Sequence, residues 1–163
     1  MAFLKFFLPM WERLRRFSAL ERPARRLFLR GAVLLPIVSL SLKTRGFRVT
    51  QSKLESSLKK KAAEQYPAEQ TNRMALTVRM VHAAVRHGIG HPSCLEESLV
   101  LWYLLGRQGI ESALRIGIRK DDGEFGAHAW VERDGVALNQ PDSQHQHYAA
   151  FDAEISSRSR ESE

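Results

Sequence analysis

Residues 92–142 constrain the fold more than any other stretch, because the spacing of apolar residues changes there from helical to alternating. Residues 94–106 form a strong, mostly apolar helical run that ends at a glycine. Residues 113–120 then alternate apolar and polar side chains, as a half-buried strand does, and residues 125–132 and 136–140 follow after short Asp and Gly turns. The pattern predicts one helix followed by an antiparallel meander, which is an α+β arrangement.

The only cysteine of the chain, Cys94, stands at the first position of this predicted helix. Ser93 is a natural N-cap, and Glu96 has the spacing of a capping box. The free N–H groups and partial positive charge at a helix N-terminus stabilise a thiolate and can donate hydrogen bonds to an oxyanion. The position fits a nucleophile, although a buried apolar cysteine explains it equally well.

A histidine, His128, lies in the second predicted strand, at residues 125–132. A cysteine that opens a helix, followed by a histidine on a strand, is the pattern of a Cys–His nucleophilic pair. Such a pair needs a third group that holds the imidazole tautomer, and a carboxylate or amide oxygen can do this.

The loop at residues 133–135 decides which side chains share a face with His128. If the loop has three residues, with Gly135 in the left-handed conformation, His128 lies opposite Gln140 and Asp142 lies on the same face. We prefer this register because it gathers apolar side chains on one surface. They are Trp130, Val136 and Leu138.

A two-residue Asp–Gly loop would swap the faces of the last strand. Asn139 would then be the diagonal neighbour of His128 on its own face. The candidates for the third group are therefore Asp142, Gln140 and Asn139, in that order.

Charge is unevenly distributed along the chain. The net charge is +7, but residues 1–50 carry 11 Lys and Arg against two Glu, a balance of +9, and the remaining residues have a balance of −2. A basic, apolar arm can contact anionic lipid or an acidic protein surface. Nucleic acid is the least expected partner, because no aromatic-interleaved basic loop, zinc spacing or helix-turn-helix pattern accompanies the charge.

The arm contains an apolar run at residues 27–42 that is too short for a membrane span. It has 16 residues and includes Arg30 and Pro36, whereas spanning takes about 20 predominantly apolar residues. We expect a buried or interfacial helical hairpin that is broken or kinked at Pro36 and stops at Gly46. A capping box of Ser18 and Glu21 should start its first helix.

The predicted organisation is one core domain with an appendage. Residues 1–66 are a basic apolar helical arm, residues 67–153 the core, and residues 154–163 a polar tail. Residues 67–72 are the expected boundary, and Thr71 or Asn72 should cap the helix that follows. A single cysteine cannot form an intrachain disulfide, so the expected location is the cytoplasm, with membrane association open for the arm.

Four blocks of sequence resemble the leader peptidase of lasso-peptide biosynthesis, the peptidase half of the split B protein. They read CLEESL at 94–99, LLGRQGI at 104–110, LRIGIR at 114–119 and FGAHAWVE at 125–132. Residues 21–22, 26–42 and 46–48 also resemble the N-terminal part of that family, so the likeness covers most of the chain. The resemblance implies a transglutaminase-like cysteine protease with a papain-like core.

The resemblance implies removal of the leader from a ribosomally made precursor peptide before a partner cyclase closes the ring. By that analogy Cys94 is the nucleophile and His128 is the general base. The family usually has Asp twelve residues after this histidine, where the present chain has Gln140, so Gln140 or Asp142 takes that role. A separate leader-recognition protein is also implied, and residues 1–50 could dock it or simply belong to the core of the fold.

Two other classes of function remain open. One is a transglutaminase-like acyltransferase or amidase that uses the same pair on another acceptor, and the other is a non-catalytic peptide-binding module in which Cys94 and His128 are merely buried. No cofactor or metal is expected, because the remaining histidines lack the spacing and the second thiolate of a metal site. These histidines are His82, His87, His91, His145 and His147.

Overall fold

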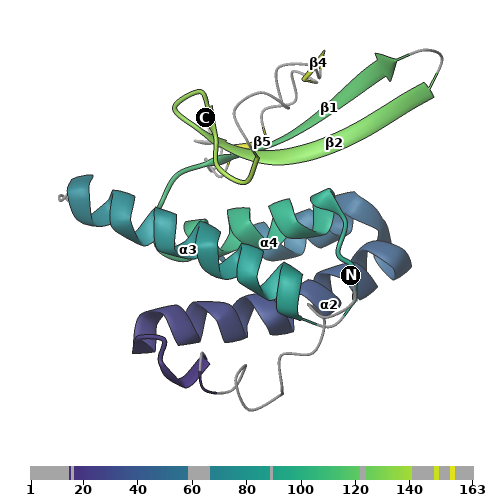
Figure 1. Ribbon diagram of the computed structural model, residues 1–163. Coiled ribbons are helices and arrows are strands. Elements are labelled where there is room, and N and C mark those ends of the chain that lie inside the picture. Colours follow the sequence, from purple (N-terminus) through teal and green to yellow (C-terminus); the bar gives the residue numbers. More distant parts are fainter. Residues whose placement is uncertain are drawn as a thin grey trace, which may run out of the picture.

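A computed structural model describes residues 15, 17–58, 67–88, 90–121, 124–140, 149–150 and 155–156. A layer of helices lies against a small antiparallel sheet (Figure 1). The predicted α+β class is therefore confirmed. The helices are α2 (Arg22–Ser56), α3 (Pro67–His87) and α4 (Cys94–Gly106), and the strands are β1 (Ala113–Asp121), β2 (Glu124–Arg133), β3 (Val136–Ala137), β4 (Ala149–Ala150) and β5 (Ile155–Ser156).

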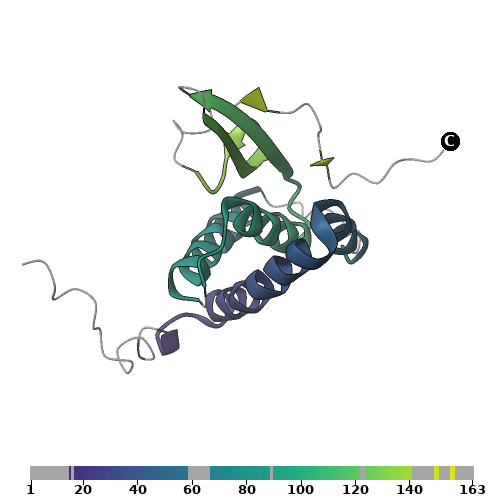
Figure 2. The same ribbon diagram turned by 90° about the vertical axis from the view of Figure 1, so that its right-hand side faces the viewer.

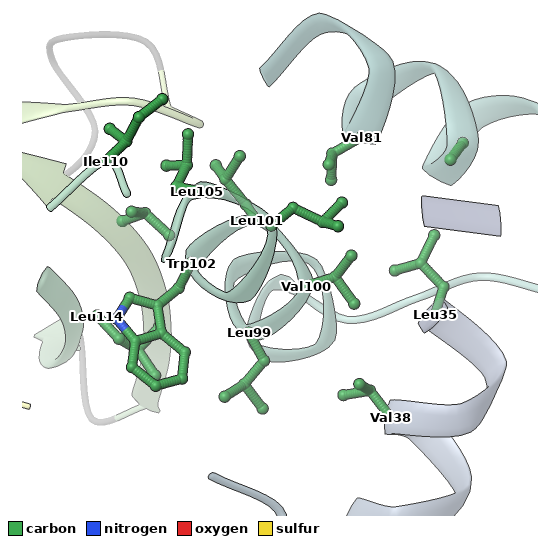
Figure 3. Close-up of a cluster of buried hydrophobic side chains, with 13 residues drawn as sticks. Leu35, Val38, Val81, Leu99, Val100, Leu101, Trp102, Leu105, Ile110 and Leu114 are labelled. Atoms are coloured by element: carbon green, nitrogen blue, oxygen red, sulfur yellow. The ribbon is translucent and has the colours of Figure 1, made fainter. Parts of the chain in front are cut away.

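Helix α4 is the centre of the fold and is buried on most sides. It packs against α2 and α3 on one side and against β1 and β2 on the other. A helix that is apolar nearly all round belongs in such an interior position. The cluster that it organises is drawn in Figure 3 and includes Leu35 and Val38 of α2, Val81 of α3, and Leu114 of β1.

Helix α2 differs from its prediction at its start and at Pro36, and agrees with it at Gly46. It begins at Arg22 with Glu21 as N-cap and no side-chain cap, and the Ser18 hydroxyl donates to the carbonyl of Arg15 instead, so the predicted Ser18 capping box is wrong. The helix continues through Pro36 and breaks at Gly46, where φ is 76° and ψ is 176°. Pro36 lies on the exposed side, where water can hydrate the carbonyl that loses its partner.

The residues expected to form a boundary are the first turns of α3. Helix α3 begins at Pro67, so residues 67–72 are helical rather than a linker, and neither Thr71 nor Asn72 caps it. Proline suits the first helical position, because its missing N–H would have no helical partner there. Helices α2 and α3 approach closely, since a Cβ at Gly31 would lie 3.2 Å from Cβ of Ala84.

The sheet has the strand order β3-β2-β1-β4, and β5 also pairs with β1 (Figure 2). Strands β1 and β2 pair without a bulge, with Gly117 opposite His128. In the second hairpin Arg133 pairs with Val136, so the loop has two residues and the preferred three-residue register is wrong. The reason is local, because Asp134 and Gly135 both have positive φ, 51° and 78°. This is what a type I′ turn requires, and its twist matches that of the flanking strands.

Candidate functional site

The candidate nucleophile stands where the sequence predicts it. Cys94 is the first residue of α4, is free and is partly buried. Glu96 N–H donates to Oγ of Ser93 at 3.3 Å, and Ser93 N–H donates to Oε2 of Glu96 at 2.6 Å, which confirms the capping box. The first turn of α4 is therefore held in a fixed geometry around Cys94.

The carboxylate of this capping box is ionised. Burial alone would raise the pKa of the Glu96 carboxyl, but hydrogen bonds from Ser39 and from Ser93 outweigh burial and the pKa is lowered. A negative charge in the first turn also complements the helix dipole. Ser39 belongs to α2, so Glu96 connects the start of α4 to the helix packed beneath it.

A buried hydrogen bond connects α4 to the strand that carries the histidine. Oγ of Ser98 donates to the carbonyl of Ala129 at 3.0 Å. Ser98 follows Cys94 by one helical turn, so the two residues share a helix face. Ala129 follows His128 directly. The structure therefore brings the first turns of α4 next to the middle of β2.

Asn139 completes this connection from the end of the β2–β3 hairpin. Its Nδ2 donates to Oγ of Ser98 at 3.0 Å, and its Oδ1 accepts from the N–H of Val131 at 2.9 Å. The side chain is only 4% exposed. The Asn139 amide thus replaces the backbone acceptor that a longer β3 would have supplied, and it holds α4 and β2 together.

The ring of His128 lies on the sheet face that it shares with Trp130. The two rings stack with their centroids 6.3 Å apart, and Nε2 of His128 is shielded from solvent. Val131 and Leu114 occupy the other face and belong to the helical core. The structure therefore joins the backbones of the cysteine and histidine segments, while the imidazole itself is on the face opposite the core.

The structure gives a different result for each of the three candidates for the residue that orients His128. Asp142 lies outside the described residues. Gln140 is partly buried, and in the two-residue register it is one position short of facing His128. Asn139 is engaged at both ends of its amide, with Val131 and Ser98.

One ionic contact beside the site could not be predicted from the sequence. Nε2 of His82 on α3 lies 2.8 Å from Oε1 of Glu97, which is in the first turn of α4. This hydrogen bond raises the pKa of His82, burial opposes it, and a further hydrogen bond to the backbone carbonyl of Asn139 adds to the rise. His82 and Glu97 are on different helices, so only the packing of α3 on α4 brings them together.

Metal chemistry has no support in the described part of the chain. Among those residues no group of three or more His, Cys, Asp or Glu could hold a metal ion. His145 and His147 lie outside the described residues.

A comparison against family models agrees with this arrangement of a helix that starts at Cys94, a strand that carries His128 and an antiparallel sheet. The model described as "Transglutaminase-like superfamily" matches residues 34–151, which is more than half of the chain. The protein belongs to the transglutaminase-like superfamily. This superfamily includes cysteine peptidases and acyltransferases, and its catalysis is generally of the cysteine-protease kind.

The match supports the coarser part of the sequence resemblance, because it covers both the Cys94 and the His128 segments. Assignment as a lasso leader peptidase is finer than the match. Neither a comparison with curated proteins nor one with solved structures gave a significant match.

Proposed function

We propose that this transglutaminase-like protein is a cysteine peptidase that removes the leader from a ribosomally made lasso precursor peptide in the cytoplasm. One observation carries the proposal. Cys94 opens a capped helix, and one turn later Ser98 is hydrogen-bonded to the carbonyl of Ala129, the neighbour of His128. The family match and the four sequence blocks around these residues support it.

In the proposed reaction His128 takes the proton of the Cys94 thiol, and the thiolate attacks the carbonyl carbon of the last leader residue and forms a C–S bond. The carbonyl electron pair moves to oxygen, where N–H groups of the first turn of α4 can donate to it. When the oxyanion collapses, the C–N bond breaks and the protonated His128 gives its proton to the leaving amine. His128 then takes a proton from water as the water oxygen attacks the thioester carbonyl. The C–S bond breaks, which releases the leader as a carboxylic acid and returns Cys94 as a thiolate beside protonated His128.

For the third residue we propose Asp142, with Gln140 as the alternative. A carboxylate can accept from the imidazole and stabilise the imidazolium that forms. Asn139 is a weaker choice, because its amide already bonds Val131 and Ser98. Its role in the proposal is to position the strand that carries His128.

The proposal includes partners. A precursor peptide is the substrate, a separate recognition protein presents its leader, and a lasso cyclase uses the amine that cleavage releases. The basic arm at residues 1–50 remains a candidate dock for the recognition protein, although Leu35 and Val38 within it are committed to the core.

Two observations favour other functions. The His128 ring shares a face with Trp130 rather than with the core, which suits a non-catalytic peptide-binding module of the same fold. Acyltransferases also belong to the superfamily, so the same thioester could pass to an amine instead of water.

The test uses the purified full chain with a lasso precursor from the same gene neighbourhood and its recognition protein. We expect cleavage at the leader junction, seen by mass spectrometry, and its loss in Cys94→Ala and in His128→Ala. Ser56→Ala is the matched control, since Ser56 is exposed at the end of α2 and should keep wild-type cleavage. Circular dichroism verifies that each variant is folded.

The outcomes separate the three functions. If Cys94→Ala and His128→Ala cleave like the wild type, the peptidase proposal is wrong. Transfer of the leader to an added primary amine, in preference to water, would replace it with the acyltransferase. The result that would indicate the non-catalytic binding module is peptide binding without cleavage, together with a Cys94 that iodoacetamide does not label near neutral pH.

A further inference from the structure

The outer face of α2 carries an apolar stripe that the fold leaves exposed. We define the stripe as four residues whose side chains are 49%, 58%, 56% and 64% exposed, respectively Leu29, Val33, Ile37 and Leu40. Their spacing places them on one side of the helix over about 16 Å. A row of large aliphatic side chains on one helix face marks an interaction surface rather than scattered exposure.

The opposite face of α2 is fixed in the protein core. It includes Leu27, Gly31, Leu35 and Val38, all of them buried. By length and composition α2 could cross a membrane, and only 17% of its most apolar stretch is buried. Crossing would remove Leu35 and Val38 from contact with α3 and α4, so the packed helix can only lie along a surface with the stripe turned outward.

Positive charge brackets the stripe at both ends. Arg22 and Arg26 precede Leu29 and Val33 by seven residues each and so lie on the same face, and Arg30 borders it. Lys43 follows the stripe at the edge of the same face, and all four cations are exposed. No Asp or Glu occurs at residues 22–54. Between Arg22 and Leu54 this face of α2 therefore presents aliphatic side chains and cations, with no carboxylate of the helix itself.

We propose that this face of α2 docks on the surface of an anionic lipid bilayer. Aliphatic side chains can enter the boundary between headgroups and acyl chains, while Arg and Lys extend to the lipid phosphates. A protein partner is less well matched, because protein interfaces are anchored by aromatic residues and the stripe has none. The proposal goes beyond the proposed peptidase function and does not depend on it.

Docking in this way would set the orientation of the whole domain. The sheet lies on the opposite side of the helix layer from α2 (Figures 1 and 2). With α2 on the bilayer, β2 and its His128 would face away from the membrane. A peptide substrate could then reach the sheet from solution.

The test is co-sedimentation of the full chain with vesicles of phosphatidylcholine alone or with a quarter of phosphatidylglycerol. We expect binding to the anionic vesicles only. The triple variant Arg22→Gln, Arg26→Gln and Arg30→Gln should bind more than about tenfold more weakly, since each cation near an anionic surface contributes roughly fivefold. The double variant Val33→Gln and Ile37→Gln should also bind more weakly than the wild type. This difference in binding should remain at high salt.

A matched control separates position from net charge. Lys53→Gln, Arg79→Gln and Arg107→Gln together remove the same charge from exposed positions outside the stripe, and should leave binding within about twofold. The proposal is overturned if this control binds as weakly as the stripe variant, or if the wild type ignores anionic vesicles. It is also overturned if the stripe variants change a concentration-dependent dimer of the protein instead, which would make a second copy the occupant.

Discussion

Helices α2 and α4 are both rich in apolar residues, yet the fold treats them in opposite ways. In α4 even the polar Glu96 and Ser98 are buried, at 8% and 0% exposure, whereas in α2 the aliphatic Leu40 is 64% exposed. The difference comes from position. Helix α4 has neighbours on both sides, α2 and α3 below and the sheet above, and α2 has the core on one side only. Apolar content alone therefore does not determine burial.

The starts of the two helices also differ, and the start of the buried helix α4 is the more tightly held. Helix α4 has a complete capping box at Ser93 and Glu96, and α2 begins at Arg22 after an N-cap, Glu21, that makes no side-chain hydrogen bond. The central helix thus has a fixed first residue, Cys94, which a reactive site requires. The outer helix has Pro23 in its first turn but no side-chain cap at its beginning.

The largest expected effect compares leucines of the two helices. Leu101→Ala in α4 should lower the free energy of unfolding by about 3 kcal/mol, because it leaves a cavity at a side chain with 0% exposure. Leu40→Ala in α2 should change it by less than about 0.5 kcal/mol. Urea denaturation followed by circular dichroism measures both, and equal losses would mean that α2 is as buried as α4.

The next effect concerns the connection between α4 and the sheet. Asn139→Leu should cost about 2 kcal/mol, because it leaves the buried N–H of Val131 without its acceptor. Asn139→Asp keeps that acceptor but loses the donor to Ser98, and should recover part of the loss. The same denaturation experiment applies. A neutral Asn139→Leu would show that α4 is held to β2 by apolar packing alone.

A smaller effect tests the two helix starts. Ser93→Ala should cost about 1 kcal/mol, and Ser93→Asp should restore most of it because Asp also caps. Glu21→Ala should cost clearly less than Ser93→Ala, since Glu21 makes no side-chain cap. Thermal unfolding of the three variants makes the comparison. If Glu21→Ala matches Ser93→Ala, the two helix starts are equally constrained.

The smallest effect is a pH dependence at His82. Its pKa is raised above the ordinary 6.5, mainly by the hydrogen bond to Glu97, so the contact stabilises the fold fully below about pH 6.5 and is lost as pH rises through the folded pKa. Arg86, which opposes the shift, and Glu97 are the charged groups involved. Because His82 is nearly half exposed, the difference should stay below about 1 kcal/mol.

The measurement compares wild type and His82→Gln at pH 5.5 and pH 8. The wild type should lose stability relative to the variant as the pH rises. An NMR titration of the His82 ring gives the pKa directly. A value at or below the ordinary one would contradict the contact between α3 and α4.

Local sequence was sufficient wherever neighbouring residues decide the outcome. Ser93 and Glu96 fix the start of α4 through contacts three residues apart, and the alternation in residues 113–120 and 125–132 specifies β1 and β2. The same reasoning proposed Cys94 and His128 as a pair. Their chemical roles, and that of Asp142, stay predictions.

Local reasoning was wrong where two local rules competed. At Pro36 a break or kink was expected, but the helix continues and breaks only at Gly46, the expected stop, because glycine can adopt a positive φ without strain. The sequence of the β2–β3 hairpin is compatible with a loop of two or of three residues. A three-residue loop is favoured from the sequence because it gathers apolar side chains on one surface. The left-handed pair Asp134 and Gly135 decided for two, because a type I′ turn matches the strand twist.

By itself the sequence determined the α+β class, the capped helix that presents Cys94 and the strand that carries His128, since each depends on residues close together in the chain. Only the tertiary structure decided that His82 meets Glu97, that Asn139 joins Ser98 to β2, and which face of α2 is buried. These outcomes depend on how separate helices and strands pack. A helix with apolar residues on several faces contains no local information about which face its neighbours will cover.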